Sequence, residues 1–275
     1  MSDFLGRMAA SSRARMEEAR RLRPDAELRA AAEATPSPTP LMLHARFDVI
    51  AEIKPRSPAE GALERTVGPP LERARQYAAG GAAALSVLTE PEAFDGTLED
   101  LSAVGEAVAT PVLRKDFLVD AYQVWEAKVA GAAGVLLIAR MLPGSALSEI
   151  AAAARALGMF VLAEAFDAPD LERIGRELDP VGSNDGSTPP VLVGVNTRDL
   201  TTLRVDPLRL ERVRPALPDG CVAVAESGIT NTDDVRRAVA LGYRMALVGT
   251  ALMRAPDAQR AVAGLIAAGR EGGGA

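Results

Sequence analysis

Short apolar runs alternate with longer amphipathic stretches along most of the chain. Eight runs rich in Val, Ile, Leu and Ala lie at 49–53, 84–88, 111–114, 134–138, 160–164, 191–195, 221–225 and 245–248. Apolar residues recur at helical spacing at 69–80, 97–108, 120–131, 144–157, 168–178, 206–214, 231–241 and 257–268. Strands that alternate with helices predict a parallel sheet, and strands that are apolar throughout are typical of a sheet covered on both faces. We therefore predict an α/β fold, a (β/α)8 TIM barrel. A doubly wound open sheet is the alternative, but eight regular units suit closure better.

The segment before the first run has a different pattern. Residues 3–23 and 25–34 predict two amphipathic helices, and 35–40 is a Pro-rich linker. We expect 1–46 to form an N-terminal helical extension, 47–270 the barrel, and 271–275 a frayed tail. The N-terminus alternates Arg and Glu without an apolar core, so it does not predict a signal peptide.

Composition narrows the possible functions. The length of 275 residues suits a barrel, which typically has about 250 residues. The net charge of −6 and the lack of a basic stripe argue against binding to nucleic acid. A single cysteine, Cys221, excludes an internal disulfide, and a single histidine, His44, argues against His-based metal sites and a Ser-His-Asp triad. No apolar run is long enough to span a membrane. We expect a cytoplasmic protein, a monomer or weak dimer, that uses lysine and carboxylates for acid–base chemistry.

Polar residues cluster where the predicted strands end. In parallel barrels the active site lies at the carboxyl ends of the strands. The residues concerned are Glu52 and Lys54, Ser86 with Thr89 and Glu90, Arg114 to Asp116, Glu164, Asn196 and Arg198, Glu226 to Gly228, and Gly249 with Thr250. Only the fourth unit departs from the pattern, since it offers Arg140 alone. The sequence therefore predicts one polar site at this end of the barrel.

Lysine is the most informative residue type. It occurs at only three positions, Lys54, Lys115 and Lys128, among 31 Lys and Arg residues. An ammonium can transfer a proton whereas a guanidinium stays charged, so arginine cannot replace a lysine that transfers a proton. Lys54 and Lys115 end apolar runs and, with Glu164, predict an acid–base set. We expect facing cations and burial to lower their pKa values toward neutrality. The alternatives are surface lysines left by drift and a structural ion pair between Glu52 and Lys54.

Two glycine turns and two aromatic residues predict how a substrate is held. Ser227-Gly228 and Gly249-Thr250 follow the seventh and eighth runs, where barrels commonly bind phosphate through backbone N–H groups. Phe94 and Phe117 on rim loops suit a flat apolar group, although loop packing is an equal explanation. Arg198 suits a carboxylate, which it can bind with two N–H groups.

At these residues the sequence resembles the indole-3-glycerol phosphate synthase family, from the N-terminal helix to about residue 265. The matching segments are Ile50 to Lys54 with Ser57-Pro58, Ser86 to Glu90, Leu113 to Phe117, Asn196 and Arg198 before Asp199-Leu200, Glu226 to Ile229, and Val248-Gly249. The resemblance implies a carboxy-lyase of tryptophan biosynthesis, without metal or organic cofactor. The implied reaction closes the ring of 1-(2-carboxyphenylamino)-1-deoxyribulose 5-phosphate and releases carbon dioxide and water.

The resemblance also implies roles for individual residues. Lys115 would protonate the ribulose carbonyl, and Lys54 and Glu164 would serve the later proton transfers. Glu52 and Asn196 would orient these groups, and Glu226 and Ser227 would line the site. The remaining assignments are Ser57, Gly228, Gly249 and Thr250 to phosphate, and Phe94, Phe117 and Arg198 to the anthranilate half.

Some positions depart from the family pattern, and other functions stay open. Ala59-Glu60 stands where the family usually has a rim cation, Phe166 where it often has histidine, Thr197 where it usually has asparagine, and the loop over 180–190 is longer. These differences leave room for a divergent secondary-metabolite paralogue. A Schiff-base aldolase and a non-enzymatic phosphate-binding barrel are further alternatives. The related isomerase of the same pathway would require a cysteine at the end of the first apolar run, where this chain has Glu52 and Lys54, and so fits less well.

Overall fold

The computed structural model describes residues 3–58, 61–62, 70–180, 188–200 and 202–271, and its centre is a closed barrel of eight parallel strands. The strands lie around the barrel in the order β1-β10-β9-β8-β7-β6-β5-β4. Their bounds are β1 Asp48–Ile53, β4 Ala84–Leu88, β5 Val112–Lys115, β6 Gly134–Ile138, β7 Phe160–Ala165, β8 Val191–Asn196, β9 Val222–Glu226 and β10 Met245–Val248. The predicted TIM barrel is confirmed, and the strand limits differ from the prediction by a residue at most.

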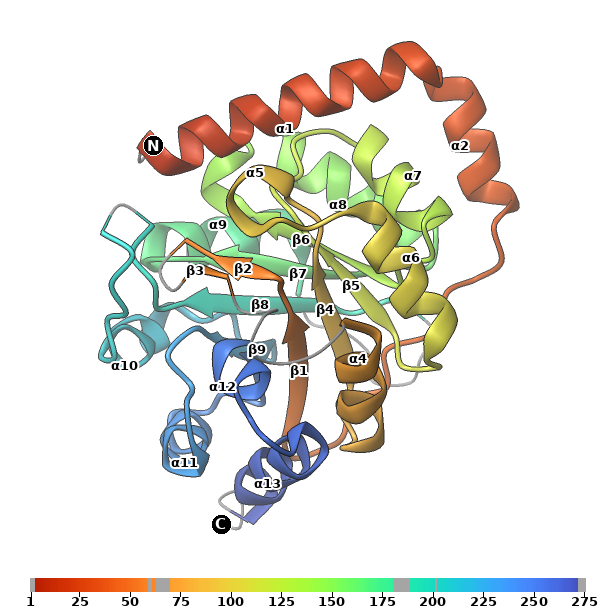
Figure 1. Cartoon of the computed structure of the whole chain (residues 1–275). Coiled ribbons are helices and arrows are strands. Elements are labelled where there is room, and N and C mark those ends of the chain that lie inside the picture. The colour runs from red at the N-terminus through yellow and green to blue at the C-terminus, as the bar shows by residue number, and fades with distance from the viewer. Residues whose placement is uncertain (1–2, 59–60, 63–69, 181–187, 201, 272–275) are drawn as a thin grey trace.

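Helices surround this barrel (Figure 1). Their bounds are α4 Pro70–Ala79, α5 Pro91–Phe94, α6 Leu98–Ala107, α7 Tyr122–Val129, α8 Ala146–Ala156, α9 Ala168–Leu178, α10 Arg209–Val213, α11 Thr232–Ala240, α12 Thr250–Met253 and α13 Ala258–Glu271. Two short 3₁₀ helices lie at Ala139–Met141 (η1) and Arg214–Ala216 (η2). Side-chain caps begin several of these helices, such as Asn231, whose Oδ1 accepts from the N–H groups of Asp233 and Asp234.

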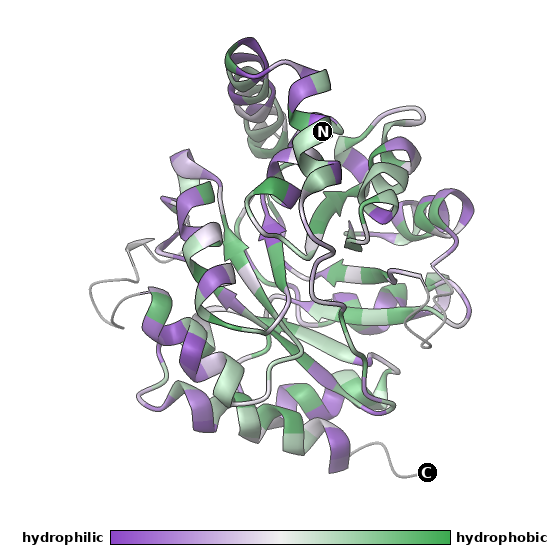
Figure 2. Cartoon of the chain, turned by 90° about the vertical axis from the view of Figure 1, so that its right-hand side faces the viewer, coloured by the Kyte–Doolittle hydropathy of each residue, from purple (hydrophilic) through white to green (hydrophobic). Residues whose placement is uncertain are grey.

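The alternation of side chains along each strand explains two separate packing layers. In β7, Val161, Ala163 and Ala165 face the surrounding helices, whereas Phe160 and Leu162 fill the barrel interior. The Phe160 ring occupies space beside Gly134, where an added Cβ would lie 2.5 Å from ring atoms. Figure 2 shows the same layering, with apolar strands at the centre and polar positions on the outer helices. Aliphatic residues can thus close this barrel although aromatic residues are rare.

The N-terminal helices α1 (Asp3–Leu22) and α2 (Asp25–Ala34) pack along one side of the barrel (Figure 1). Leu5 and Met8 of α1 are buried in the same apolar cluster as Phe117 and Phe166. The Gln123 Nε2 group of α7 donates to Ser12 Oγ at 2.8 Å. α1 therefore contributes to the core near the strand ends.

The structure adds elements that periodicity does not predict. A short hairpin, β2 Arg56–Ser57 and β3 Gly61–Ala62, follows β1. The Glu90 carboxylate accepts from the N–H groups of Glu92 and Ala93 and so starts α5. α10 begins three residues later than predicted because the Asp206 carboxylate accepts from the Leu208 N–H in a turn.

The C-terminal helix α13 continues to Glu271, beyond the predicted end at 268 and into the predicted tail. Residues 272–275, most of the loop over 180–190, and Ala59-Glu60 lie outside the described residues. None of the described helices has the length and apolar content to cross a membrane.

Candidate active site

The first polar pair of the site lies at the end of β1. Glu52 and Lys54 are two residues apart and point to the same side, and Lys54 Nζ lies 2.8 Å from Glu52 Oε1. Gly249 makes room for this pair, since an added Cβ there would lie 2.3 Å from Glu52 Oε1 and 2.9 Å from Lys54 Nζ. Burial acts to raise the pKa of Glu52, but the cations Lys54 and Lys115 outweigh burial and lower it. Glu52 is therefore ionised and holds Lys54 in place.

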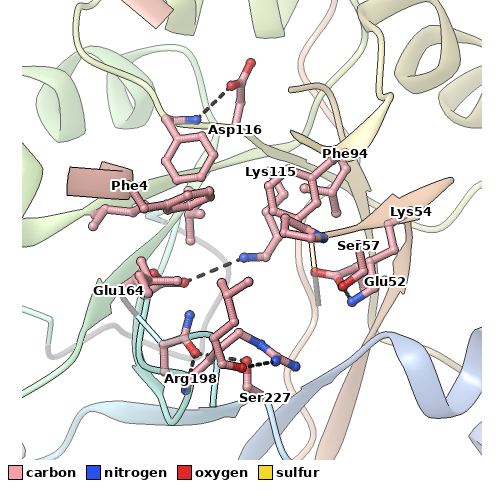
Figure 3. Close-up of a pocket in the computed structure, with 18 residues that line it drawn as sticks. Phe4, Glu52, Lys54, Ser57, Phe94, Lys115, Asp116, Glu164, Arg198 and Ser227 are labelled. Carbon is pink, nitrogen blue, oxygen red and sulfur yellow. Dashed lines mark hydrogen bonds and ion pairs between the residues drawn. The ribbon is translucent and has the colours of Figure 1, made fainter. Parts of the chain in front are cut away.

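Lys115, the last residue of β5, lies between two carboxyl groups. Figure 3 shows the nearer of the two, that of Glu164. Its Nζ is 3.6 Å from Glu164 Oε2 of β7 and 3.7 Å from Glu226 Oε2 of β9. The Lys115 side chain is 15% exposed, whereas those of Glu164 and Glu226 are almost fully buried. Three strands of the barrel thus bring one ammonium and two carboxyl groups to one point.

The expected direction of the Lys115 pKa is wrong. Burial does lower the pKa of Lys115, but Glu164, Glu226 and Glu52 together outweigh burial and raise it above its ordinary value. The expectation counted Lys54 as a facing cation, but Glu52 pairs with Lys54. Lys115 is therefore a cation at neutral pH and is suited to donate a proton.

Asp116 anchors the end of β5. Its carboxylate accepts from Arg15 of α1, Arg114, Thr89 Oγ1 and the Phe117 N–H. Burial acts to raise the pKa of Asp116, but Arg114 and Arg15 lower it to about 2. These contacts fix the backbone on the carboxyl side of Lys115. Thr89, which the sequence placed among the polar strand ends, supports the site through Asp116.

The ends of β8 and β9 are joined by hydrogen bonds. Asn196 Oδ1 accepts from Ser227 Oγ and from the Arg198 N–H, each at 2.9 Å. Thr197 Oγ1 lies within hydrogen-bond distance of the carbonyl oxygens of Glu226 and Ser227. Ser227 has a φ of 64°, a conformation that costs free energy for a residue other than glycine. The threonine that departs from the family pattern therefore helps to hold a strained turn.

Aromatic residues line one side of the cavity above Lys115 (Figure 3). The Phe117 ring is 6.3 Å from Phe94 and 6.0 Å from Phe4 between centroids. Phe4 was not predicted as a site residue, because a lone aromatic on a helix surface gives no signal in the sequence. Leu136 and Ile138 of β6 complete the apolar lining.

Arg140, which follows β6, does not line this cavity. Its guanidinium pairs with Asp167 and Asp170 and lies over the Phe166 ring at 4.6 Å. The fourth barrel unit therefore contributes the apolar side chains of Leu136 and Ile138 on β6 to the cavity, and no polar group. Phe166 packs against an arginine at the rim.

A second cavity adjoins the first at the ends of β9 and β10. The two share Glu52, Lys54, Lys115, Arg198 and Ser227 as lining residues. Gly228, Gly249, Thr250 and Arg254 line only the second. Gly228 has a φ of +76° and an added Cβ would lie 2.8 Å from Val205, so this turn requires glycine. The second cavity therefore combines backbone, hydroxyl and cationic groups with the carboxyl groups of Glu52 and Glu226.

Every residue to which the sequence assigns a catalytic or substrate-binding role lines one of these two cavities. Among the other polar residues at the strand ends, Ser86, Thr89, Glu90, Arg114 and Arg140 line neither. The first cavity holds Glu52, Lys54, Ser57, Phe94, Lys115, Phe117, Glu164, Asn196, Arg198 and Ser227. The second adds Glu226, Gly228, Gly249 and Thr250. Their roles stay predictions. Ser57 lines the cavity with the aromatic residues and not the one with the glycine turns.

The remaining lysine and the cysteine lie elsewhere. Lys128 of α7 donates to the Pro36 carbonyl at 2.7 Å and so holds the Pro-rich linker. Burial raises the pKa of Cys221 to about 11, which makes this thiol unreactive. In the ranges that the structure describes, no group of three or more His, Cys, Asp or Glu is placed to hold a metal ion.

The barrel resembles solved structures of other enzymes at low sequence identity. Thiamine phosphate pyrophosphorylase from Pyrococcus furiosus aligns with a TM-score of 0.59 and 19% identity, over 83% of this chain and 97% of that one. 3-Hexulose-6-phosphate synthase from Salmonella typhimurium aligns with a TM-score of 0.61 and 14% identity, over 81% of this chain and 98% of that one. These similarities show the fold alone.

Sequence comparison is more specific. The family model described as indole-3-glycerol phosphate synthase matches residues 5–265. A curated protein of that name from a Nocardioides species is 47% identical over 86% of this chain and 88% of its own length. Another, from Mycobacterium avium, is 41% identical over 88% of this chain and 86% of its own. The protein therefore belongs to the indole-3-glycerol phosphate synthase family.

Proposed function

We propose that the protein converts 1-(2-carboxyphenylamino)-1-deoxyribulose 5-phosphate to indole-3-glycerol phosphate, carbon dioxide and water, with Lys115 as the first proton donor. Family membership supports the reaction. One observation supports the assignment to this site: the Lys115 ammonium lies between Glu164 and Glu226 where an aromatic-lined cavity meets a cationic one.

The phosphate of the substrate occupies the second cavity. Lys54, Lys115, Arg198 and Arg254 line it and supply positive charge. The first turn of α12 begins there at Thr250, and the first N–H groups of a helix have no acceptor within the helix. Barrels commonly bind phosphate at this place, with a short extra helix.

The anthranilate half occupies the first cavity. Phe4, Phe94 and Phe117 offer apolar ring surface on which an aromatic group packs. Arg198 lines both cavities, and only one of its five guanidinium N–H donors is accounted for by the bond to the Leu203 carbonyl. Its remaining donors suit the substrate carboxylate, and the two ends of the substrate then place the ribulose carbonyl near Lys115.

The reaction proceeds by proton transfers that lysine and carboxyl groups can supply. The ring carbon that bears the carboxylate attacks the ketone carbon, and Lys115 donates a proton to the ketone oxygen, which becomes a hydroxyl. The bond to the carboxylate then breaks, carbon dioxide leaves, and its electron pair restores the aromatic ring. A second proton lets the hydroxyl leave as water, and the carbon beside the nitrogen loses a proton to a base. Lys54 and Glu164 serve these later transfers.

The charge on Lys115 favours this chemistry over a Schiff base. A Schiff-base lysine must be a neutral amine to attack a carbonyl, but the neighbouring carboxylates raise the pKa of Lys115. A proton donor needs the ammonium form, which these carboxylates stabilise. The cationic site therefore supports the decarboxylating synthase.

The direct test is turnover by the purified chain. We expect the fluorescence of indole-glycerol phosphate to appear together with one equivalent of carbon dioxide. Borohydride added during turnover should trap no covalent adduct. Absence of the indole product from the anilino substrate would contradict the proposal, and a trapped sugar-phosphate adduct would favour an aldolase.

Three further properties belong to the same proposal. We infer a cytoplasmic enzyme that is a monomer or weak dimer, with residues 1–46 as an extension on a barrel domain of residues 47–270. Sedimentation of the purified chain over a range of concentrations tests the oligomeric state. A tight dimer at all concentrations would contradict this part of the proposal.

A further inference from the structure

A glycine in the middle of β8 lies where two carboxyl groups approach each other. Gly194 pairs in register with Glu164 of β7 on one side and with Val224 of β9 on the other. An added Cβ at Gly194 would lie 1.9 Å from Glu226 Oε1 and 3.0 Å from the Glu226 carboxyl carbon. Glycine inside a strand often marks such a close approach. Glu226 therefore extends from the end of β9 across β8, toward the strand that carries Glu164.

Most of the carboxyl oxygens of Glu164 and Glu226 accept no hydrogen bond. Both oxygens of Glu226 and Oε2 of Glu164 are buried without a hydrogen-bond partner among the described residues. Lys115 Nζ, at 3.6 and 3.7 Å from them, is beyond hydrogen-bond distance. Both Oε2 atoms face the same Lys115 ammonium, and Glu164 raises the pKa of Glu226 through its charge and through a hydrogen bond between the two carboxyl groups. A single shared proton would therefore satisfy oxygens that are otherwise unpaired.

We propose that Gly194 is a positioning residue: its missing side chain is the opening through which Glu226 reaches Glu164, so that the two carboxyl groups share one proton beside Lys115. The inference rests on the proposed function, because the shared proton is assigned to that reaction. Gly194 itself touches no reacting atom.

The charges around the pair agree with a shared proton. Burial raises the pKa of Glu226, the Glu164 carboxylate raises it further, and Lys115 offsets only part of the increase. Glu52 of β1 also bears on Glu226 and raises its pKa as well. Two buried carboxyl groups this close do not both ionise, since one pKa of such a pair rises strongly.

A shared proton gives the site an acid and a base together. The reaction requires a second proton donor after Lys115, for the leaving hydroxyl, and a base for the carbon beside the nitrogen. Beside Lys54, which serves the same later transfers, a Glu226 carboxyl and a Glu164 carboxylate provide one of each, and exchange of the proton between them restores the pair. The space beside Gly194 therefore decides whether the site has both this proton donor and this base.

A double-mutant cycle tests the positioning role. Gly194→Ala places a methyl group where the Glu226 carboxyl lies, and a flexible side-chain end can move away, so we expect a folded enzyme. We expect kcat to fall about a hundredfold with little change in KM. Glu226→Ala should lower kcat by a similar factor. Adding Gly194→Ala to Glu226→Ala should then cost less than about twofold more, because no carboxyl group remains to displace.

An equal loss of kcat from Gly194→Ala in the wild type and in Glu226→Ala would contradict the positioning role. Gly194→Ala would then act through the strand or through Leu162, whose Cδ1 would lie 3.2 Å from the added Cβ. Gly264→Ala is the matched control, since Gly264 lies in α13 with no atom within 4 Å of an added Cβ. That variant should keep the wild-type kcat.

Infrared difference spectroscopy tests the shared proton without turnover. At neutral pH the wild type should show the C=O stretch of a protonated carboxyl group that is absent from Glu226→Gln and altered in Gly194→Ala. Glu226→Gln keeps the shape but has no proton to transfer, so its kcat should also fall while KM is retained. A wild type that turns over normally but lacks this band, or a fully active Glu226→Gln, would overturn the inference. Failure of the wild type to form product would instead overturn the proposed function.

Discussion

Arg15 of α1 and Asp116, the residue after Lys115, form an ion pair with two hydrogen bonds, at 2.9 and 3.2 Å. The Asp116 side chain has no exposed surface, and that of Arg15 is 29% exposed. The pair joins the N-terminal helix directly to the strand end that carries the proposed proton donor. Because Phe4 lies on the same helix, the pair also fixes one aromatic side of the cavity.

Removing Arg15 should therefore affect stability and substrate binding together. We expect Arg15→Met to lower the free energy of unfolding by about 2 kcal/mol, since it removes two charge-assisted hydrogen bonds to a buried carboxylate. We also expect KM to rise, because α1 and Phe4 are held less firmly. Denaturant unfolding and steady-state kinetics measure the two effects.

A matched control lies on the same helix. Arg21 pairs with Glu18 on the surface, where both side chains are more than half exposed. Arg21→Met should change stability by less than about 0.5 kcal/mol and leave KM unchanged. Equal effects of the two variants would contradict the role of the Arg15–Asp116 pair.

Asp116 should make the protein sensitive to acid. Its pKa of about 2 in the folded state lies below the value of about 3.9 for an unfolded chain. A lowered folded pKa contributes stability that is present above the unfolded value and is lost as pH falls through the folded one. We expect the stability advantage of the wild type over Asp116→Asn to shrink by about 2–3 kcal/mol between about pH 5 and about pH 2. A constant difference over that range would show that Asp116 is not held as an ionised group.

Gly249 should be essential for the geometry of the Glu52–Lys54 ion pair. A methyl group there would lie 2.3 Å from Glu52 Oε1 and 2.9 Å from Lys54 Nζ, so Gly249→Ala must displace one of them. We expect kcat/KM to fall at least about tenfold, because Lys54 lines both cavities. Stopped-flow fluorescence of product formation measures the loss. Wild-type kinetics in Gly249→Ala would show that the Glu52–Lys54 distance does not matter to turnover.

The sequence predicts much of this architecture because its signals are local. Continuous apolar runs such as 134–138 indicate buried strands independently of the rest of the sequence. Lys115 and Glu164 are polar residues at the ends of such runs. Parallel strands in a barrel bring their carboxyl ends together, so residues far apart in sequence could be placed in one site. The presence of α5 and the late start of α10 depend on single carboxylates, Glu90 as a helix cap and Asp206 in a turn, which periodicity does not detect.

The unpredicted features depend on contacts across the fold. Phe4 faces the site only because α1 docks through Leu5, Met8 and Arg15, and no repeat in the sequence encodes that docking. The pKa of Lys115 was expected to fall, because the sequence does not show that Glu164, Glu226 and Glu52 all lie close enough to outweigh burial. The approach of Glu226 to Glu164 depends on Gly194, which in the sequence is one of 24 glycines.

The central claim is that Lys115 donates the first proton, and single-turnover kinetics of Lys115→Met tests it most directly. We expect the rate of product formation to fall by about 10²–10⁴-fold while the fold and the binding of substrate persist. Lys128→Met is the control, since Lys128 holds the linker at Pro36 and does not line either cavity. That variant should lose some stability and keep the wild-type rate. A folded Lys115→Met enzyme that forms indole-glycerol phosphate at the wild-type rate would contradict the account.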